Sequence, residues 1–480
     1  PHQNFAEYVA TRLRWARESV TDEHLLDLMG RVFPGARNVQ MQLLPELQTT
    51  SLIASAIGRA VVLYASEQYP GNAARRIPKV LKIGPADEIA REIDRYERFV
   101  NGWLHQYRQA RLENHARVWH LGAITYAFLG VTPHDMAPFR AFYLYPRSQS
   151  DVILGMLRQL FIETCHNWYA QEREQVPEMV LFDEYDNALE LQERIEERLD
   201  TQTPTLTFEG IDAPLPNPAI WALETGRQII FPTITTCITH GDLHGDNLFV
   251  DRNMQAWLVD FGRSGFGHAL RDFVELEADI KLRLISRGGA DLASLAALER
   301  SLLASSAPGE MLLPSAAVAA NPALHKAFQV VAGLRHLAFL TTCIDNPLEY
   351  YHALLYETLY MATLRRLQNP VRERAWCSAA LIVERLQKPA GAPGTSAALT
   401  DLTGASLAQQ PSEQAIPALT ARLRYLAFCE TSVKLQAAMY NGGEGGVPAT
   451  LQAGVSALGQ AVTHTRHLLD SLRGNGGTAG

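Results

Sequence analysis

The chain of 480 residues is poor in cysteine and has no excess of basic residues. Its five cysteines form no C-x-x-C pair, so we expect neither a disulfide framework nor a zinc knuckle. We expect all five to be buried free thiols in a reducing cytoplasm. Lysine and arginine total 43 against 51 aspartates and glutamates, a net charge of −8. Nucleic-acid binding needs a basic patch, so we expect no nucleic-acid partner.

Long apolar runs are also missing. No stretch of about 18 apolar residues occurs, so we expect no membrane span. The polar start, Pro1 to Glu7, has no basic segment followed by an apolar one, so we expect no signal peptide. Hydrophobic residues make up 47% of the chain, which is ordinary for a globular protein with a large core.

The first third of the chain reads as strands with one main helix. Short apolar runs predict strands at 39–44, 59–64 and 78–83, and two more across 118–129 that break at Gly122. A proline followed by acids at 85–88 suits a helix start. Most later residues read as helix, and one short hairpin pairs 247–250 with 256–259.

These patterns predict an α+β chain in several parts. We expect N-terminal helices over 1–35, a small strand-rich part over 36–133, a helical part over 134–387, a linker over 388–416, a helical hairpin over 417–473 and a disordered tail over 474–480. Leucines and valines recur at steps of four and three between 451 and 472. Packing within the hairpin is favoured over a dimer or a partner protein held by this seam.

The residues that carry chemistry lie around the hairpin. Strand pairing brings Asn247 and Asp260 to the open end, where an amide oxygen and a carboxylate suit Mg²⁺. Asp242, on the loop just before, can accept a proton from a substrate hydroxyl beside that metal.

The segments 240–247 and 258–262, with His240-Gly241-Asp242 and Asp260-Phe261-Gly262, resemble the protein-kinase-like superfamily. The continuation through Arg263 is most similar to its aminoglycoside phosphotransferase branch. The resemblance implies a bilobal fold, with a small antiparallel-sheet N-lobe and a large helical C-lobe.

The same resemblance implies roles for the motif residues. Asp242 would be the catalytic base, His240 a catalytic-loop residue that supports it, and Asn247 and Asp260 the Mg²⁺ ligands. Asp272 is similar to an acid that braces this loop from the next helix, and it reads equally well as a helix N-cap.

Two further residues are expected to bind nucleotide. Lys82 lies in what looks like the strand whose lysine contacts the α- and β-phosphates, and Glu92 in what looks like the helix whose glutamate pairs with it. Only ten residues separate them, which leaves Glu88 as a rival partner. No G-x-G-x-x-G occurs, and the candidate phosphate loops are 48–51 and 55–58.

The resemblance implies ATP and Mg²⁺ as cofactors and transfer of the γ-phosphoryl group to a hydroxyl. Only eight residues separate Gly262 from Arg271 and no A-P-E motif follows, so a small-molecule acceptor is favoured over a protein substrate. An acidic stretch at 183–186 could attract a cationic acceptor, although such runs are usually solvated helix faces.

A fainter likeness, at 122–130 and 349–355, is to the ternary-complex-associated kinase-like domains of bacterial conflict systems. It implies a role in signalling or defence. The missing glycine motif keeps two alternatives open, namely a pseudokinase that senses nucleotide or serves as a scaffold, and an atypical protein kinase.

Overall fold

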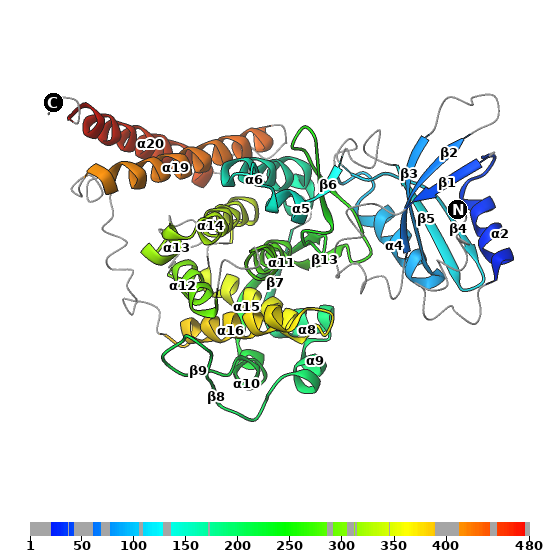
Figure 1. Ribbon diagram of the computed structural model, residues 1–480, viewed down its shortest axis with the longest axis horizontal. Coiled ribbons are helices and arrows are strands. Elements are labelled where there is room, and N and C mark those ends of the chain that lie inside the picture. Colours follow the sequence, from blue (N-terminus) through cyan, green and yellow to red (C-terminus); the bar gives the residue numbers. More distant parts are fainter. Residues whose placement is uncertain are drawn as a thin grey trace. The chain divides into compact units, whose positions relative to one another are not determined.

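The structure of the protein is a computed structural model. The chain folds into two compact units. Within the described residues, the first unit takes those up to Tyr145, with Ile238–Phe266 and Arg365–Leu367, and the second takes the rest. Figure 1 shows small sheets and many helices, which confirms the α+β class. The structure describes residues 21–36, 38–42, 61–68, 77–104, 109–127, 136–170, 173–285, 291–304, 312, 314–344, 346–388, 412–441 and 449–475.

A five-stranded antiparallel sheet of order β1-β2-β3-β5-β4 is the centre of the first unit. The predicted strands at 39–44, 59–64 and 78–83 are present, although residues 43–44 and 59–60 lie outside the described residues. The strands are β1 (Asn38–Gln42), β2 (Val61–Gln68), β3 (Ile77–Pro85), β4 (Leu112–Val118) and β5 (Leu121–Ala127).

The predicted break at Gly122 is wrong. The turn lies at Trp119 and His120, and Gly122 is inside β5. A Cβ at Gly122 would stand 2.8 Å from the Cβ of Ile89 on α4 (Ala86–Phe99), so glycine serves close packing between strand and helix here. The true turn carries Trp119 at φ 54, a residue type that gives no turn signal in sequence.

Helices cover both faces of this sheet (Figure 1). On one face, α2 (Asp22–Val32) begins at the Thr21 cap and buries Leu25 and Leu28 against a cluster that includes Leu81 and Ile83 of β3. Since side chains alternate along a strand, Lys82 points to the opposite face. There α4 follows β3 directly and buries Ile89, Glu92 and Tyr96.

A second small sheet completes the first unit and carries the predicted hairpin. Its order is β12-β11-β6, from β6 (Met136–Pro138), β11 (Leu248–Asp251) and β12 (Ala256–Leu258), and α5 (Phe139–Leu144) follows β6. Leu248 pairs with Leu258 and Val250 with Ala256, as the sequence predicted.

The second unit is mainly helical. Its elements, wholly or in part, are α6 (Ser150–Arg158), η3 (Gln159–Thr164), α7 (His166–Ala170), β7 (Glu174–Val180), α8 (Leu181–Leu189), α9 (Leu191–Arg198), β8 (Thr205–Leu206), β9 (Leu215–Pro216), α10 (Pro218–Glu224), η4 (Gly226–Gln228), β10 (Ile230–Thr239), β13 (Gly265–His268), α11 (Arg271–Asp279), η5 (Ile280–Leu284), α12 (Leu292–Leu303), α13 (Ala316–Ala320), α14 (Pro322–Thr342), α15 (Pro347–Thr363), α16 (Asn369–Leu386), α19 (Ser412–Asn441) and α20 (Ala449–Asn475).

The last two helices form the predicted hairpin and lie side by side (Figure 1). Leu419 and Leu469 are buried together, with Leu423, Leu468 and Leu472 packed around them. The seam predicted on α20 therefore faces α19. The hairpin begins earlier than expected, at Ser412, and most of the predicted linker and tail lies outside the described residues, as do the candidate phosphate loops at 48–51 and 55–58.

One cysteine departs from expectation. All five are free, and four are buried, but Cys343 is exposed. It follows α14 as its C-cap with φ 57, so its side chain lies where the chain turns away from the helix.

No single helix in the described ranges is both long enough and apolar enough to cross a membrane. The helices α14 and α15 are long and apolar enough only when they are taken together, and they are bent 118° to each other.

Candidate active site

Lys82 joins two carboxylates in the first unit. Its Nζ donates to Glu92 Oε2 at 2.7 Å and to Asp260 Oδ1 at 2.8 Å. Of the two candidate partners on α4, Glu92 makes this ion pair, because it shares the buried helix face with Ile89. The structure thus brings together a strand lysine, a helix glutamate and an aspartate 178 residues further along the chain.

The charges of this group are set by its neighbours. Burial acts to lower the pKa of Lys82, but Asp260 and Glu92 outweigh it and raise that pKa. Burial also acts to raise the pKa of Asp260, and Lys82 outweighs it, so that pKa is lowered. Although Asp260 lies deep among its neighbours, 41% of its side chain is exposed, against 3% for Glu92. Asp260 is therefore a charged carboxylate that a ligand can reach.

The backbone at Asp260 is unusual, since its φ is 65. Aspartate tolerates this left-handed region better than most residues. Phe261 follows, and its ring packs against His240 at 5.5 Å and Tyr96 of α4 at 5.6 Å between centroids. These ring contacts join the loop after β12 to α4.

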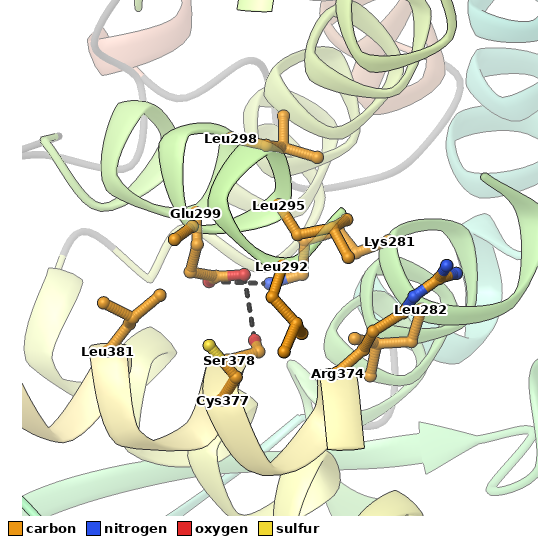
Figure 2. Close-up of a pocket in the computed structure, with 11 residues that line it drawn as sticks. Lys281, Leu282, Leu292, Leu295, Leu298, Glu299, Arg374, Cys377, Ser378 and Leu381 are labelled. Atoms are coloured by element: carbon orange, nitrogen blue, oxygen red, sulfur yellow. Dashed lines mark hydrogen bonds and ion pairs between the residues drawn. The ribbon is translucent and has the colours of Figure 1, made fainter. Parts of the chain in front are cut away.

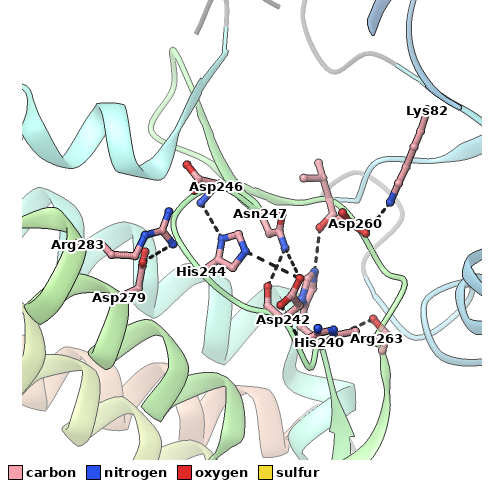
Figure 3. A network of polar contacts seen from close by, with 12 residues as sticks. Lys82, His240, Asp242, His244, Asp246, Asn247, Asp260, Arg263, Asp279 and Arg283 are labelled. Atoms are coloured by element: carbon pink, nitrogen blue, oxygen red, sulfur yellow. Dashed lines mark hydrogen bonds and ion pairs between the residues drawn. The ribbon is translucent and has the colours of Figure 1, made fainter. Parts of the chain in front are cut away.

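Asp242 is held by donors on both oxygens (Figure 3). Asn247 Nδ2 donates to Oδ2 at 3.2 Å, and Arg263 donates to Oδ1 at 3.3 Å. Burial acts to raise the pKa of Asp242, but the charges of Arg263, His244, His240 and Arg366 outweigh it and hold that pKa below its ordinary value. Asp242 is thus ionised at neutral pH.

His240 and Gly241 fix the loop that presents Asp242. The buried His240 donates from Nε2 to the Val259 carbonyl at 3.0 Å, which ties this loop to the residue before Asp260. Gly241 has φ 73, and a Cβ there would stand 2.5 Å from the Arg263 carbonyl oxygen. Only glycine fits this close approach.

Asn247 and Asp260 carry an amide oxygen and a carboxylate, the two kinds of oxygen that a hard cation takes. The Val259 amide donates to the Asn247 carbonyl at 3.1 Å. The hairpin therefore ends at Asn247 and Val259, directly before Asp260, as predicted. The two hydrogen bonds of the Asn247 side chain use its nitrogen, and both go to Asp242. An amide oxygen and an accessible carboxylate are the ligands that Mg²⁺ takes from proteins. The described residues hold no group of three or more His, Cys, Asp or Glu arranged for a metal.

Asp272 and the acidic stretch lie in the second unit. Asp272 is fully buried in the first turn of α11, and the Tyr169 hydroxyl donates to it at 2.7 Å. In α8, Asp183 is exposed, while Glu184 accepts from the His268 amide. The acids at 183–186 thus serve partly in packing between elements.

Several residues beside the site were not predicted for these contacts. His244 lies 3.9 Å from Asp242 (Nε2 to Oδ2), and Arg366 belongs to the same unit although it follows α15. Tyr126 donates from its hydroxyl to Glu92 Oε1 at 2.6 Å. His244 lies in the motif itself and could have been found, whereas Arg366 and Tyr126 carry no local signal.

Comparisons with known proteins bear on this arrangement. The family model described as Ternary complex associated domain 9 matches residues 186–359, which include Asp242, Asn247, Asp260 and Asp272. None of the curated proteins compared with the chain matches it.

Two solved structures are similar to the chain. One is the amicoumacin kinase hAmiN in complex with AMP-PNP, Ca²⁺ and Ami, at 12% identity over 78% of this chain and 97% of that chain, with a TM-score of 0.37. The other is aminoglycoside phosphotransferase APH(3'')-Id from Streptomyces rimosus ATCC10970, at 15% identity over 55% of this chain and 84% of that chain, with a TM-score of 0.30.

The predicted likeness to ternary-complex-associated domains is confirmed by the family match.

Proposed function

We propose that the chain is a phosphotransferase that moves the γ-phosphoryl group of Mg-ATP to the hydroxyl of a small-molecule acceptor. The observation that carries the proposal is the bridge that Lys82 makes between Glu92 and Asp260 within one unit. A charged lysine beside an accessible carboxylate is what nucleotide phosphates and their metal require.

Asp242 would act on the acceptor. Its lowered pKa keeps it ionised, so it can take the proton of a hydroxyl placed beside it. The donors Asn247 and Arg263 fix the plane of its carboxylate, which favours one orientation of the acceptor. Asp242 would then return the proton to solvent.

Lys82 would neutralise phosphate charge. Its raised pKa keeps the ammonium charged, and Glu92 holds it in place from a buried position. Asn247 and Asp260 would hold Mg²⁺, which when bound supplies charge stabilisation to the phosphate oxygens. Positioning and electrostatics provide most of the rate enhancement in this class of reaction.

A nucleotide-sensing pseudokinase is the second candidate. It is favoured by the engagement of both Asp242 oxygens, one by Arg263 and one by Asn247. Such a protein would bind Mg-ATP without transfer and would serve signalling or defence in a bacterial conflict system. An atypical protein kinase is a third candidate, in which the acceptor is a protein side chain.

The test incubates the purified full chain with Mg²⁺ and ATP labelled on the γ-phosphate. One series adds a panel of hydroxyl-bearing small molecules, aminoglycosides included, and another adds cell lysate. Label on a small molecule supports the first proposal, and label on protein supports the third. Mg-ATP binding by calorimetry without any transfer or hydrolysis supports the pseudokinase, and no binding removes all three.

We also propose that the protein works in the cytoplasm. A partner protein or a second copy remains a proposal for α19 and α20, whose apolar seams face each other. Light scattering of the full chain across a concentration series measures this directly, and a constant monomer mass removes the dimer.

A further inference from the structure

Tyr126 contacts the ion pair at the centre of the candidate site from the sheet. It lies on β5 opposite Val80 of β3, and 5% of it is exposed. Its hydroxyl donates to Glu92 Oε1 at 2.6 Å, while Lys82 donates to the other oxygen, Oε2, at 2.7 Å. Each oxygen of one buried carboxylate therefore has its own donor.

A second donor constrains the carboxylate in a way that one donor does not. The last torsion of a glutamate side chain is broad, so a carboxylate held at one oxygen can still turn about its axis. Turning would move Oε2 away from the Lys82 ammonium. The Tyr126 hydroxyl opposes this turn, because its hydrogen bond holds Oε1 in place.

Tyr126 is a hydrogen-bond donor at neutral pH. Burial, and then the charge of Glu92, raises the pKa of Tyr126 well above its ordinary value. The phenol is therefore protonated at neutral pH and keeps its proton available for the bond to Glu92. The contact is a fixed part of the site and not a pH-dependent one.

We propose that Tyr126 is a positioning residue for phosphoryl transfer that acts through Glu92 to hold the Lys82 ammonium in place. This inference rests on the proposed function, because it assigns Lys82 to nucleotide phosphates. Tyr126 contacts neither Asp242 nor Asn247 by any hydrogen bond among the described residues. Its effect is expected in the phosphate-positioning step and not in proton removal.

The second unit supplies a matched control. Tyr350 donates to Glu277 Oε2 at 2.6 Å and is also buried, so Tyr350→Phe removes a hydrogen bond of the same type and length. Both variants should lose similar thermal stability. For the folded protein we expect Tyr126→Phe to lower kcat about 5- to 20-fold with a smaller change in the KM for ATP, and Tyr350→Phe to change neither.

Coupling to Glu92 provides the second measurement. If Tyr126 acts through Glu92, then Tyr126→Phe should have no further effect on kcat in a Glu92→Gln background. Equal fold-losses in both backgrounds would overturn the inference, as would a Tyr126→Phe variant with the kcat of the wild type.

A chemical probe separates this inference from the proposed function. Acetylation of Lys82 by acetic anhydride, followed by mass spectrometry, reports how firmly the amine is held and needs no turnover. We expect Lys82 to react several-fold faster in Tyr126→Phe than in the wild type or in Tyr350→Phe, and equal rates would overturn the inference. A wild type that binds no Mg-ATP would instead overturn the proposed function, whatever the labelling shows.

Discussion

Two ion-pair networks, one in each unit, are built from the same kinds of side chain: a lysine, two carboxylates and a tyrosine. In the first, Lys82 lies between Glu92 and Asp260, and Tyr126 donates to Glu92. In the second, Lys281 lies between Glu277 and Glu299 at 3.0 and 2.9 Å, and Tyr350 donates to Glu277. Arg335 adds a second cation beside Glu277.

Access to solvent distinguishes the two. The side chain of Asp260 is 41% exposed, whereas those of Lys281, Glu277 and Glu299 are 1%, 0% and 4% exposed. Figure 2 shows that Glu299 accepts hydrogen bonds from both Lys281 and Ser378. These residues line a cavity of about 10 Å³. Such a cavity holds about one water molecule. A lysine between two acids is therefore a candidate site only where one acid remains open to a ligand.

The largest effect is expected at Asp242. We expect Asp242→Asn to lower phosphoryl transfer about 10²- to 10⁴-fold, the range for loss of a general base, while Mg-ATP affinity stays within a few-fold. Radiolabel transfer and calorimetry measure the two quantities. Asp183→Asn, at an exposed acid on α8, is the control. Transfer at the wild-type rate by Asp242→Asn would falsify the assignment of the base.

The two lysines give the most direct test of the comparison. Lys82→Met should abolish Mg-ATP binding, and because it leaves the buried Glu92 without its cation it should also lower stability. Lys281→Met should leave Glu299 buried without its cation and lower the free energy of unfolding by about 3–5 kcal/mol, while the folded fraction still binds nucleotide. Urea unfolding and calorimetry check both variants. Weakened binding by Lys281→Met at unchanged stability would contradict the distinction.

Acid should weaken the buried network. Burial acts to raise the pKa of Glu277, but Arg335 and Lys281 outweigh it and lower that pKa to about 2. Because the folded pKa lies below the unfolded one, the stabilisation is complete above about pH 4.5 and is lost as the pH falls toward 2, at most about 3 kcal/mol. Urea unfolding from pH 5 to 3 should show a shallower loss in Glu277→Gln than in the wild type. Parallel curves would remove Glu277 as the cause.

Two glycines give the smallest expected effects. An added Cβ at Gly241 meets the Arg263 backbone at 2.5 Å with φ 73, whereas one at Gly333 on α14 meets the Leu154 side chain at 2.4 Å. Each alanine should cost about 1–3 kcal/mol of stability. Only Gly241→Ala should lower transfer by the folded enzyme, since it displaces the loop of Asp242. Equal kcat values for the two variants would show that this loop adapts.

Local spacing explains what the sequence predicted well. The hairpin turns at 251–255, so the positions of Asn247 and Asp260 follow from pairing alone. The ion pair of Lys82 with Glu92 follows from a strand that leads directly into a helix whose apolar face is readable. These are contacts within one element or between neighbours in sequence, and periodicity describes them.

Contacts between distant segments were beyond the same reasoning. Tyr126 reads as one apolar residue of a strand, and nothing near it shows that its hydroxyl meets Glu92. Arg366 follows α15, about a hundred residues after Asp260, and its charge acts on Asp242. Likewise, α2 covers the face of the sheet that carries Leu81 and Ile83 of β3. That face exists only after β2 and β5 have paired with β3, so the sequence of α2 alone does not predict the contact.

The segments that make up the first unit are not consecutive in the sequence, and this affects what is present while the chain is being synthesised. That unit is discontinuous, since Ile238–Phe266 joins it only after the intervening segment of the second unit. At the usual pace of a ribosome, the roughly 90 residues between Tyr145 and Ile238 take about 5 to 20 s to make. For that interval Lys82 and Glu92 exist without Asp242 or Asp260. A chain that terminates before Asp260 therefore lacks part of this set of charges.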